Sequence, residues 1–298
     1  MNTSRSSLWL AVAALAVGFL PPGLAAAPRQ GLRFDSPGVL NWSERTVPGG
    51  GKPAIAVVPL AAGEGERILA MPALAEEHGS LPVAQVLFGC APPSEACERA
   101  GERKRIAAAG DSVRRAGQRL SVNPASGAVA VFVDWNQPAT RTAEGDSESH
   151  RYLGRLDGSG YHRVDVRFGH DAPGSFLVNP ANGGTVFVHD GGDVVALAPD
   201  GLRLVTFNAL NPPLSLRLGI LDAAGPRLEL HCLATGDRSS LQFKGWRDPQ
   251  TFDLVVKPNG TQDAAAIPVR VERSAGAWRL ATPAPARLVE VAGFGCRP

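Results

Sequence analysis

Two adjacent histidine–aspartate pairs are the side chains best suited to chemistry in this sequence. His170-Asp171 and His189-Asp190 each lie at the end of a strand-like run. An imidazole beside a carboxylate can transfer protons or help to hold a divalent metal ion. The simpler interpretation is that all four are turn residues, because Asp190 begins an Asp-Gly turn and lacks the longer series of oxygen ligands that a calcium loop requires. We favour the turn interpretation and keep a metal site as the alternative.

The motifs of common hydrolases do not occur. The sequence contains no Gly-x-Ser-x-Gly nucleophile elbow and no His-Glu-x-x-His zinc motif. By elimination, we expect a binding protein rather than an enzyme, without a cofactor. The metal alternative would bring a divalent ion such as Ca²⁺.

A dense basic run lies between residues 99 and 119, and Arg103, Lys104 and Arg105 are at its centre. Such a run can engage an acidic protein, a phosphate head group or a polyanion. No aromatic residue lies within it, so we do not expect stacking on nucleic-acid bases. We favour the simpler interpretation that the basic run forms a solvated surface, which keeps the protein soluble.

Trp135 and Trp246 are the candidate aromatic contacts. Both precede polar turns, Asn-Gln-Pro after Trp135 and Arg-Asp-Pro after Trp246. Exposed tryptophan suits a protein interface or a platform for carbohydrate. Aromatic side chains that cap the hydrophobic core are the more common explanation.

Export is indicated by the first 25 residues. Arg5 precedes a 13-residue apolar run at 8–20. That run is shorter than the roughly 20 residues of a membrane-spanning helix and is typical of a signal peptide. Small residues predict cleavage before Ala26; the alternative is an uncleaved N-terminal anchor. We therefore expect a periplasmic or secreted protein with no transmembrane segment after cleavage.

Charge and composition narrow the class further. The chain has 30 basic and 28 acidic residues, so nothing global argues for nucleic acid or a membrane surface as partner. Gly and Pro, with 34 and 25 residues, make up about a fifth of the chain, against a usual share of roughly 12%. Because both interrupt helices, this composition excludes a coiled coil or helical array. It predicts many short elements joined by turns.

The four cysteines fit an oxidising compartment. Cys90 and Cys97 are separated by a short, proline-containing loop, whereas Cys232 and Cys296 lie far apart. Of the three possible pairings, we favour Cys90 with Cys97 and Cys232 with Cys296. The second bridge would tie the C-terminus to the body of the domain.

Residues 119–298 have the pattern of an all-β meander. Short apolar runs rich in β-branched residues alternate with Asp-Gly and Asn-Gly turns. These dipeptides accept the positive φ angles that tight hairpins require. We expect this part to form one domain together with the less regular residues 26–118.

The elements of residues 26–118 are less clear from the pattern. Residues 54–60 and 83–88 have the apolar character of buried strands. A helix is expected over 94–115 with Ser94 as its N-cap, although residues 103–108 can also form an edge strand.

A hexapeptide occurs twice, as Val-Asn-Pro-Ala-Ser-Gly at 122–127 and Val-Asn-Pro-Ala-Asn-Gly at 178–183. Each copy reads as the turn of a β-hairpin, and the interval predicts a reused four-stranded unit. Residues 176–207, four strands joined by three short turns, resemble a β-propeller blade. The resemblance implies a propeller-like fold of about five or six blades at roughly 45 residues each. β-Sandwich domains share these local signals and are the alternative.

We expect an exported, non-enzymatic protein-binding module, for example a periplasmic inhibitor or immunity protein against a secreted effector. The propeller resemblance implies an alternative, a metal-dependent hydrolase or lactonase. The metal ligands would then be Asn123, His170, Asp171, Asn179 and Asp190. A third hypothesis is a cell-envelope glycan-binding protein that uses Trp135 and Trp246.

Overall fold

The computed structural model describes residues 31–33, 35–41, 55–72, 84–92, 94–137, 146–169, 174–189, 193–208, 214–234, 239–258, 265–290 and 293–298. The predicted signal peptide lies outside these residues, as do His170, Asp171 and Asp190. No helix in the described part of the chain is long and apolar enough to cross a membrane.

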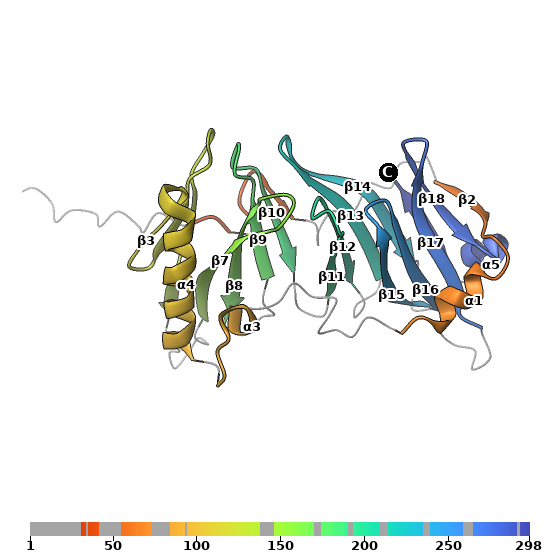
Figure 1. Ribbon diagram of the computed structural model, residues 1–298, viewed down its shortest axis with the longest axis horizontal. Coiled ribbons are helices and arrows are strands. Elements are labelled where there is room, and N and C mark those ends of the chain that lie inside the picture. Colours follow the sequence, from red (N-terminus) through yellow and green to blue (C-terminus); the bar gives the residue numbers. More distant parts are fainter. Residues whose placement is uncertain are drawn as a thin grey trace, which may run out of the picture. The chain divides into compact units, whose positions relative to one another are not determined.

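Strands dominate the described residues (Figure 1). They are β1 (Val39–Asn41), β2 (Ala56–Pro59), β3 (Val113–Ala116), β4 (Arg119–Val122), β5 (Ala130–Val133), β6 (Trp135–Gln137), β7 (Asp146–Arg155), β8 (His162–Phe168), β9 (Gly174–Val178), β10 (Thr185–His189), β11 (Asp193–Leu197), β12 (Arg203–Asn208), β13 (Leu214–Asp222), β14 (Gly225–Ala234), β15 (Ser239–Asp248), β16 (Thr251–Pro258), β17 (Ile267–Ser274), β18 (Ala277–Thr282) and β19 (Phe294–Arg297). The helices are α1 (Glu64–Ala70), α3 (Ala84–Phe88), α4 (Glu95–Ala109), α5 (Pro285–Glu290) and the 3₁₀ turn η1 (Gly110–Ser112).

Consecutive antiparallel strands form four sheets. Their strand orders are β3-β4-β5, β1-β10-β9-β8-β7-β6, β11-β12-β13-β14-β19 and β15-β16-β17-β18-β2. Two strands from the N-terminal part join sheets formed later in the chain, because β1 pairs in parallel with β10 and β2 in parallel with β18. Each sheet is therefore a local meander extended by strands from distant segments.

The hydrophobic core lies between successive sheets. One cluster packs the β3–β5 sheet against the sheet of β7–β10, with Phe132 and Phe176 in contact at its centre. A second joins β9 and β10 to β12 and β13. The third and largest packs the β11–β14 sheet against the β15–β18 sheet. Burying one face of a sheet on the next is the packing principle of a sandwich.

The repeated Asn-Pro hexapeptide marks turns that contact one another. The main-chain N–H groups of Ala125 and Ser126, in the β4–β5 turn, donate to the carbonyls of Pro180 and Ala181 in the β9–β10 turn, both at 2.8 Å. The side chain of Asn179 then donates to the Asp222 carbonyl of the next turn, between β13 and β14, at 3.1 Å. The repeat therefore places equivalent hairpin turns of successive sheets side by side.

Two Asp-Gly turns meet in the same way. Gly158 and Gly201 both have positive φ, +81° and +69°. A Cβ on Gly158 would overlap the carbonyl oxygen of Asp200, and a Cβ on Gly201 would overlap that of Asp157. Glycine is thus required at both turns by backbone conformation and by close backbone approach.

The all-β prediction is confirmed, and the stacked sheets correspond to the sandwich-like alternative. None of the sheets that the structure describes closes into a barrel, and they do not confirm a propeller. The cysteines pair as the sequence favoured, Cys90 with Cys97 and Cys232 with Cys296.

The prediction of a strand over residues 83–88 is wrong, because Ala84–Phe88 form the short helix α3. The predicted helix over 94–115 is shorter than expected. It ends at Ala109, where Gly110 takes a positive φ of 62°, and Val113–Ala116 form a strand instead. Residues 103–108 are helical rather than an edge strand. Gly101 is explained by packing, since a Cβ there would overlap the ring of Phe88.

Candidate functional site

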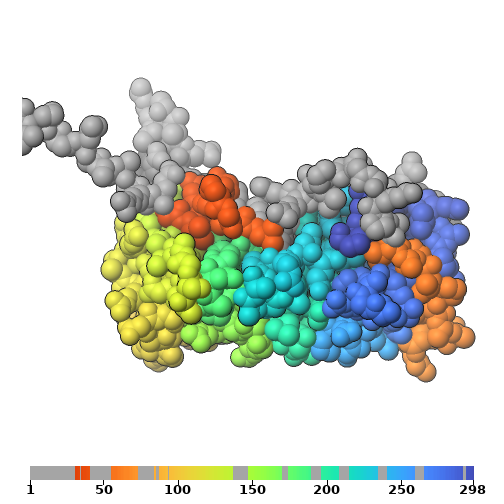
Figure 2. All heavy atoms as spheres, turned by 90° about the horizontal axis from the view of Figure 1, so that it is seen from above, coloured from red at the N-terminus to blue at the C-terminus, as the bar shows by residue number. Residues whose placement is uncertain are grey.

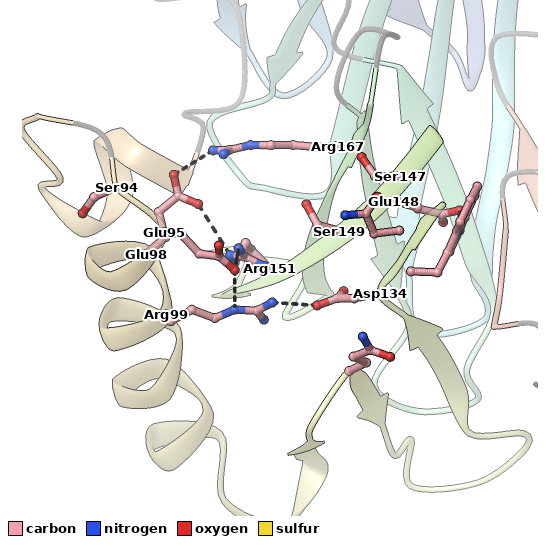
Figure 3. Close-up of a pocket in the computed structure, with 13 residues that line it drawn as sticks. Ser94, Glu95, Glu98, Arg99, Asp134, Ser147, Glu148, Ser149, Arg151 and Arg167 are labelled. Carbon is pink, nitrogen blue, oxygen red and sulfur yellow. Dashed lines mark hydrogen bonds and ion pairs between the residues drawn. The ribbon is translucent and has the colours of Figure 1, made fainter. Parts of the chain in front are cut away.

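A polar pocket of about 490 Å³ lies between α4 and the strands β6 and β7 (Figure 3). It is lined by residues at the start of α4 (Ser94, Glu95, Glu98, Arg99), around β6 (Gln118, Asp134, Trp135, Asn136), on β7 (Ser147, Glu148, Ser149, Arg151) and on β8 (Arg167). We call this the polar pocket. Charged and amide side chains dominate its walls, which distinguishes it from the mostly apolar pockets of typical small-molecule sites.

The first two turns of α4 line the pocket. An N-cap and a disulfide fix the residue at which this helix begins. The hydroxyl of Ser94 accepts a hydrogen bond from the main-chain N–H of Cys97 at 3.3 Å, as an N-cap does. The disulfide between Cys90 and Cys97 joins this turn to the segment before it. Glu95 and Glu98 lie in the first turn, where the positive end of the helix dipole favours carboxylates.

Arginines from α4 and β3 converge on two buried carboxylates behind the pocket. Arg99 donates to Asp134 at 2.7 Å and to Glu102 at 3.3 Å. Arg115 donates to the same two side chains, each at 3.0 Å. Glu102 is fully buried and also accepts the main-chain N–H of Tyr152 at 2.9 Å. These bonds fasten α4 to β3 and β7.

Two further arginines enclose Glu98 on the pocket side. Arg167 on β8 donates to Glu98 at 3.0 Å, and Arg151 on β7 lies 3.5 Å from it. Arg151 is buried, whereas the side chain of Arg167 is 41% exposed. Glu95 makes only longer contacts, 3.4 Å to Arg151 and 3.6 Å to Arg99, and its side chain is 73% exposed. Glu95 and Arg167 are thus an acid and a base that solvent can reach (Figure 3).

His150 is fully buried between two carboxylates. Its Nδ1 lies 3.2 Å from Asp134 and its Nε2 lies 3.1 Å from Glu148. Burial lowers the pKa of His150, but the hydrogen bond with Asp134 and the close contact with Glu148 outweigh burial and raise it above its usual value. Burial likewise opposes ionisation of Asp134, yet hydrogen bonds from His150 and Arg99 hold the pKa of Asp134 well below its usual range. Trp135 completes the arrangement by donating to Glu148 at 2.9 Å.

With His150 protonated, the acids and bases of this arrangement are equal in number. We call the whole set the α4–β7 cluster. It comprises the acids Glu95, Glu98, Glu102, Asp134 and Glu148 and the bases Arg99, Arg115, Arg151, Arg167 and His150. Buried charges are costly unless they are paired. The imidazolium form of His150 supplies the positive charge that matches the fifth carboxylate.

The chemistry that this pocket offers is hydrogen bonding and charge complementarity. Its carboxylates contact arginine or histidine, so none is an isolated base, and the main acidic side chain open to solvent is Glu95. A general base needs hydrogen-bond access to a proton that it can remove. The pocket therefore offers hydrogen-bonding groups of both charges to a polar ligand.

The basic residues predicted as binding residues take different positions. Arg103 and Lys104 are exposed on α4. Arg105 is half-buried and donates to the carbonyls of Leu153 at 2.7 Å and Leu87 at 3.3 Å. None of the three lines the polar pocket. The flanking arginines of the same run, at 99 and 115, belong to the α4–β7 cluster instead.

The structure does not bring the two predicted tryptophans together. Trp135 is half-buried on β6 and lines the polar pocket. Trp246 is half-buried on β15, in another sheet, where it packs against the core. Its indole N–H donates to the carbonyl of Ala196 at 3.2 Å, and its ring meets Phe252 edge-on.

Two of the five proposed metal ligands, Asn123 and Asn179, are described. They occupy equivalent positions in the contacting β4–β5 and β9–β10 turns. Asn123 donates to the carbonyl of Asp111 at 3.0 Å, and fully buried Asn179 accepts from the main-chain N–H of Ala181 at 2.8 Å. His170, Asp171 and Asp190 lie outside the described residues. Within the described ranges, no three His, Cys, Asp or Glu side chains are grouped as metal ligands.

Sequence reasoning missed His150, Glu98 and Asp134. Their partners are distant along the chain: Asp134 is 16 residues from His150 and 35 from Arg99, and Glu98 is 69 from Arg167. The spacing of the acidic residues in α4 is the one sequence pattern that pointed to this site. Glu95, Glu98 and Glu102 recur at helical spacing, which places three carboxylates on one face.

Comparison of the chain with family models, with curated proteins and with solved structures finds no match.

Proposed function

We propose that this protein is an exported binding protein whose polar pocket receives a polar segment of a partner protein, without catalysing a reaction on it. The concrete form that we expect is an inhibitor or immunity protein against a secreted effector. Export is supported by the N-terminal apolar run and by the two disulfides, which suit an oxidising compartment.

The observation that carries the proposal is that the charged side chains of the polar pocket are paired with one another. Its buried acids and bases already contact one another, which stiffens the walls of the pocket and leaves them poorly suited to proton transfer. A rigid, pre-organised surface binds a partner with a small loss of conformational entropy. Such a surface favours recognition over catalysis.

The rim of the pocket supplies contacts for a partner. Glu95 and Arg167 offer one exposed charge of each sign, at 73% and 41% side-chain exposure. Asn136 is exposed on β6 beside the half-buried indole of Trp135. Tryptophan and arginine are enriched where protein interfaces concentrate their binding energy. A partner segment with polar and charged side chains would complement this rim.

Site-specific photo-crosslinking tests the proposal in the cells that make the protein. A photoreactive residue is placed at Asn136 and, as matched control, at Gln250, an exposed carboxamide in the β15–β16 turn. We expect a discrete crosslinked partner from position 136 and not from position 250. The purified partner should then bind the wild-type chain, and Asn136→Arg should weaken binding about tenfold or more, as loss of a central interface contact does. Gln250→Arg should leave binding unchanged.

Two results would overturn the proposal. One is a set of crosslinked products that is the same at both positions. The other is equal affinity of the Asn136→Arg and Gln250→Arg variants for the partner. An effect on the partner's own enzymatic or toxic activity separates an inhibitor from a passive binder.

A further inference from the structure

A second, smaller pocket lies along the last turns of α4. It has a volume of about 290 Å³ and is lined by Arg105, Ala108, Ala109, Tyr152, Gly154 and Arg155. It contains two guanidinium groups, one phenol and no carboxylate. Its composition is therefore unlike that of the polar pocket, where acids and bases are matched.

The two arginines of this pocket have no acidic partner in the described part of the chain. Arg105 donates to the main-chain oxygens of Leu153 and Leu87, and Arg155 donates to the hydroxyl of Ser112 at 3.4 Å. A guanidinium has five N–H donors, so both side chains retain donors for a ligand. In the α4–β7 cluster, by contrast, each arginine contacts a carboxylate.

The backbone is adapted to bring these groups together. The pairing of β7 with β8 shifts register between Tyr152 and Gly154, which indicates a β-bulge. Gly154 has a φ of +110°, and a Cβ there would lie 3.0 Å from Nη1 of Arg105. Bulges commonly redirect side chains at functional sites. Here the bulge and the absent side chain allow Arg105 to approach β7 closely.

Buried polar groups behind the pocket lie in a positive local field. The hydroxyl of Tyr152 lies 2.9 Å from Nδ1 of His162, which is fully buried and whose Nε2 has no hydrogen-bond partner among the described residues. Burial and the charge of Arg155 lower the pKa of His162 to about 4. The neutral imidazole adds no charge of its own, so the positive potential comes from the arginines.

We propose that this pocket binds a tetrahedral oxyanion, a phosphate or sulfate group, held by Arg105 and Arg155 beside the Tyr152 side chain. Two guanidinium groups without a competing carboxylate are the donor set that suits such an anion. A volume of about 290 Å³ has room for an oxyanion and for part of a larger ligand that carries it. This site is separate from the proposed partner pocket, so either can fail without the other.

Calorimetric titration and equilibrium dialysis of the purified full chain test the site. Inorganic phosphate, sulfate and glycerol phosphate are titrated at constant ionic strength, with chloride as the reference anion. We expect saturable binding of one anion per chain at millimolar or lower concentration. Tighter binding of glycerol phosphate than of inorganic phosphate would show that the group is carried on a larger ligand; equal binding would point to the free anion.

Substitutions locate the binding. Arg155→Gln should weaken phosphate binding about tenfold or more, the effect of losing a charge-assisted hydrogen-bonded partner. Arg155→Lys should retain part of the affinity, because it keeps the charge but loses the planar donor geometry. Arg103→Gln is the matched control, with the same charge change on an exposed α4 side chain. Circular dichroism confirms that each variant is folded.

The site is overturned if phosphate and sulfate bind no more than chloride does. It is also overturned if Arg103→Gln weakens binding as much as Arg155→Gln, because general attraction to a basic surface would then explain the result.

Discussion

Two clusters of arginines and carboxylates fasten helices to sheets in this protein, and they differ in what they contain. The α4–β7 cluster joins α4 to β3, β7 and β8 and lines a pocket. The second, which we call the α1–β16 cluster, joins α1 to β15, β16 and β17 (Figure 1). It consists of Glu64, Arg247, Asp253 and Arg270. Figure 2 shows orange residues of the N-terminal part beside blue residues of the C-terminal part.

The α1–β16 cluster pairs carboxylates with arginines alone. Arg270 contacts Glu64 at 2.6 Å and fully buried Asp253 at 3.0 Å, and Arg247 bonds the same two carboxylates. Glu64 also contacts the exposed Arg67 at 2.6 Å, so the two acids meet three arginines and no histidine. The α4–β7 cluster, in contrast, includes an imidazole, that of His150, between two of its carboxylates. In both clusters, arginines paired with buried carboxylates hold a helix against a sheet. Where an imidazole takes the place of an arginine, such a cluster becomes sensitive to pH.

We expect the two clusters to differ most in the free energy of unfolding that is lost when the central acid of each is removed. Asp134→Ala removes one of the two carboxylates that Arg99 and Arg115 share, and it removes the acceptor of both the ring and the main-chain N–H of His150. We expect it to lower the free energy of unfolding by about 3–5 kcal/mol. Asp253→Ala should cost less, about 1–3 kcal/mol, because Glu64 still contacts both arginines and no buried imidazole loses its acceptor. Urea denaturation measures both.

The order of the two losses is the decisive result. A loss for Asp253→Ala equal to or larger than that for Asp134→Ala would contradict the view that the α4–β7 cluster is the more heavily connected of the two. The slope of unfolding free energy against urea should match the wild type in both variants, which shows that the native and unfolded states keep their compactness.

The pH dependence of stability should follow His150. Its pKa is raised in the folded protein above the usual histidine value of 6.5, so it binds a proton more tightly when folded. The stability that it contributes is present below pH 6.5 and is lost as the pH rises through the folded pKa. We expect the free energy of unfolding of the wild type to fall as the pH rises above about 6.5, and this fall to flatten in His150→Gln.

Two other buried histidines affect the stability of the protein at lower pH than His150 does. Burial lowers the pKa of His162 and of His231 to about 4 in the folded protein. Their contribution is present above pH 6.5 and is lost as the pH falls towards 4. Both remain in His150→Gln, so that variant should keep the acidic loss of stability. If the free energy of unfolding falls above pH 6.5 to the same extent in His150→Gln as in the wild type, His150 is not the group responsible for the fall.

Local features of the fold were predictable, because turns and caps depend on neighbouring residues. Asp157-Gly158 and Asp200-Gly201 mark hairpin turns through the φ angles that glycine permits, and Ser94 marks the start of α4 as its N-cap. The short apolar run at 83–88 was misassigned, since periodicity alone does not separate a short strand from a short helix. The stacking of one sheet on the next depends on contacts between distant segments, which local patterns do not encode.

The site was less predictable than the fold for the same reason. The basic run was noticed, but a sequence does not show that Arg115 reaches Glu102 and Asp134 while the adjacent Arg114 points to solvent. Trp135 was selected for its polar neighbours, and it does line the polar pocket, although its indole N–H bonds buried Glu148. Charge matching across β-strands is visible only once the strands are paired.

The smallest effect is expected from an exposed ion pair of the same basic run. Arg114 contacts Asp111 at 2.9 Å, but their side chains are 70% and 96% exposed. Exposed pairs are screened by water and salt, so Arg114→Ala should change the free energy of unfolding by less than about 0.5 kcal/mol. Arg115→Ala, one residue further along β3, is the contrasting variant and should be strongly destabilising. Because the two substitutions remove the same charge from adjacent residues, similar losses would mean that net charge, rather than pairing with buried carboxylates, governs how the α4–β7 cluster stabilises the protein.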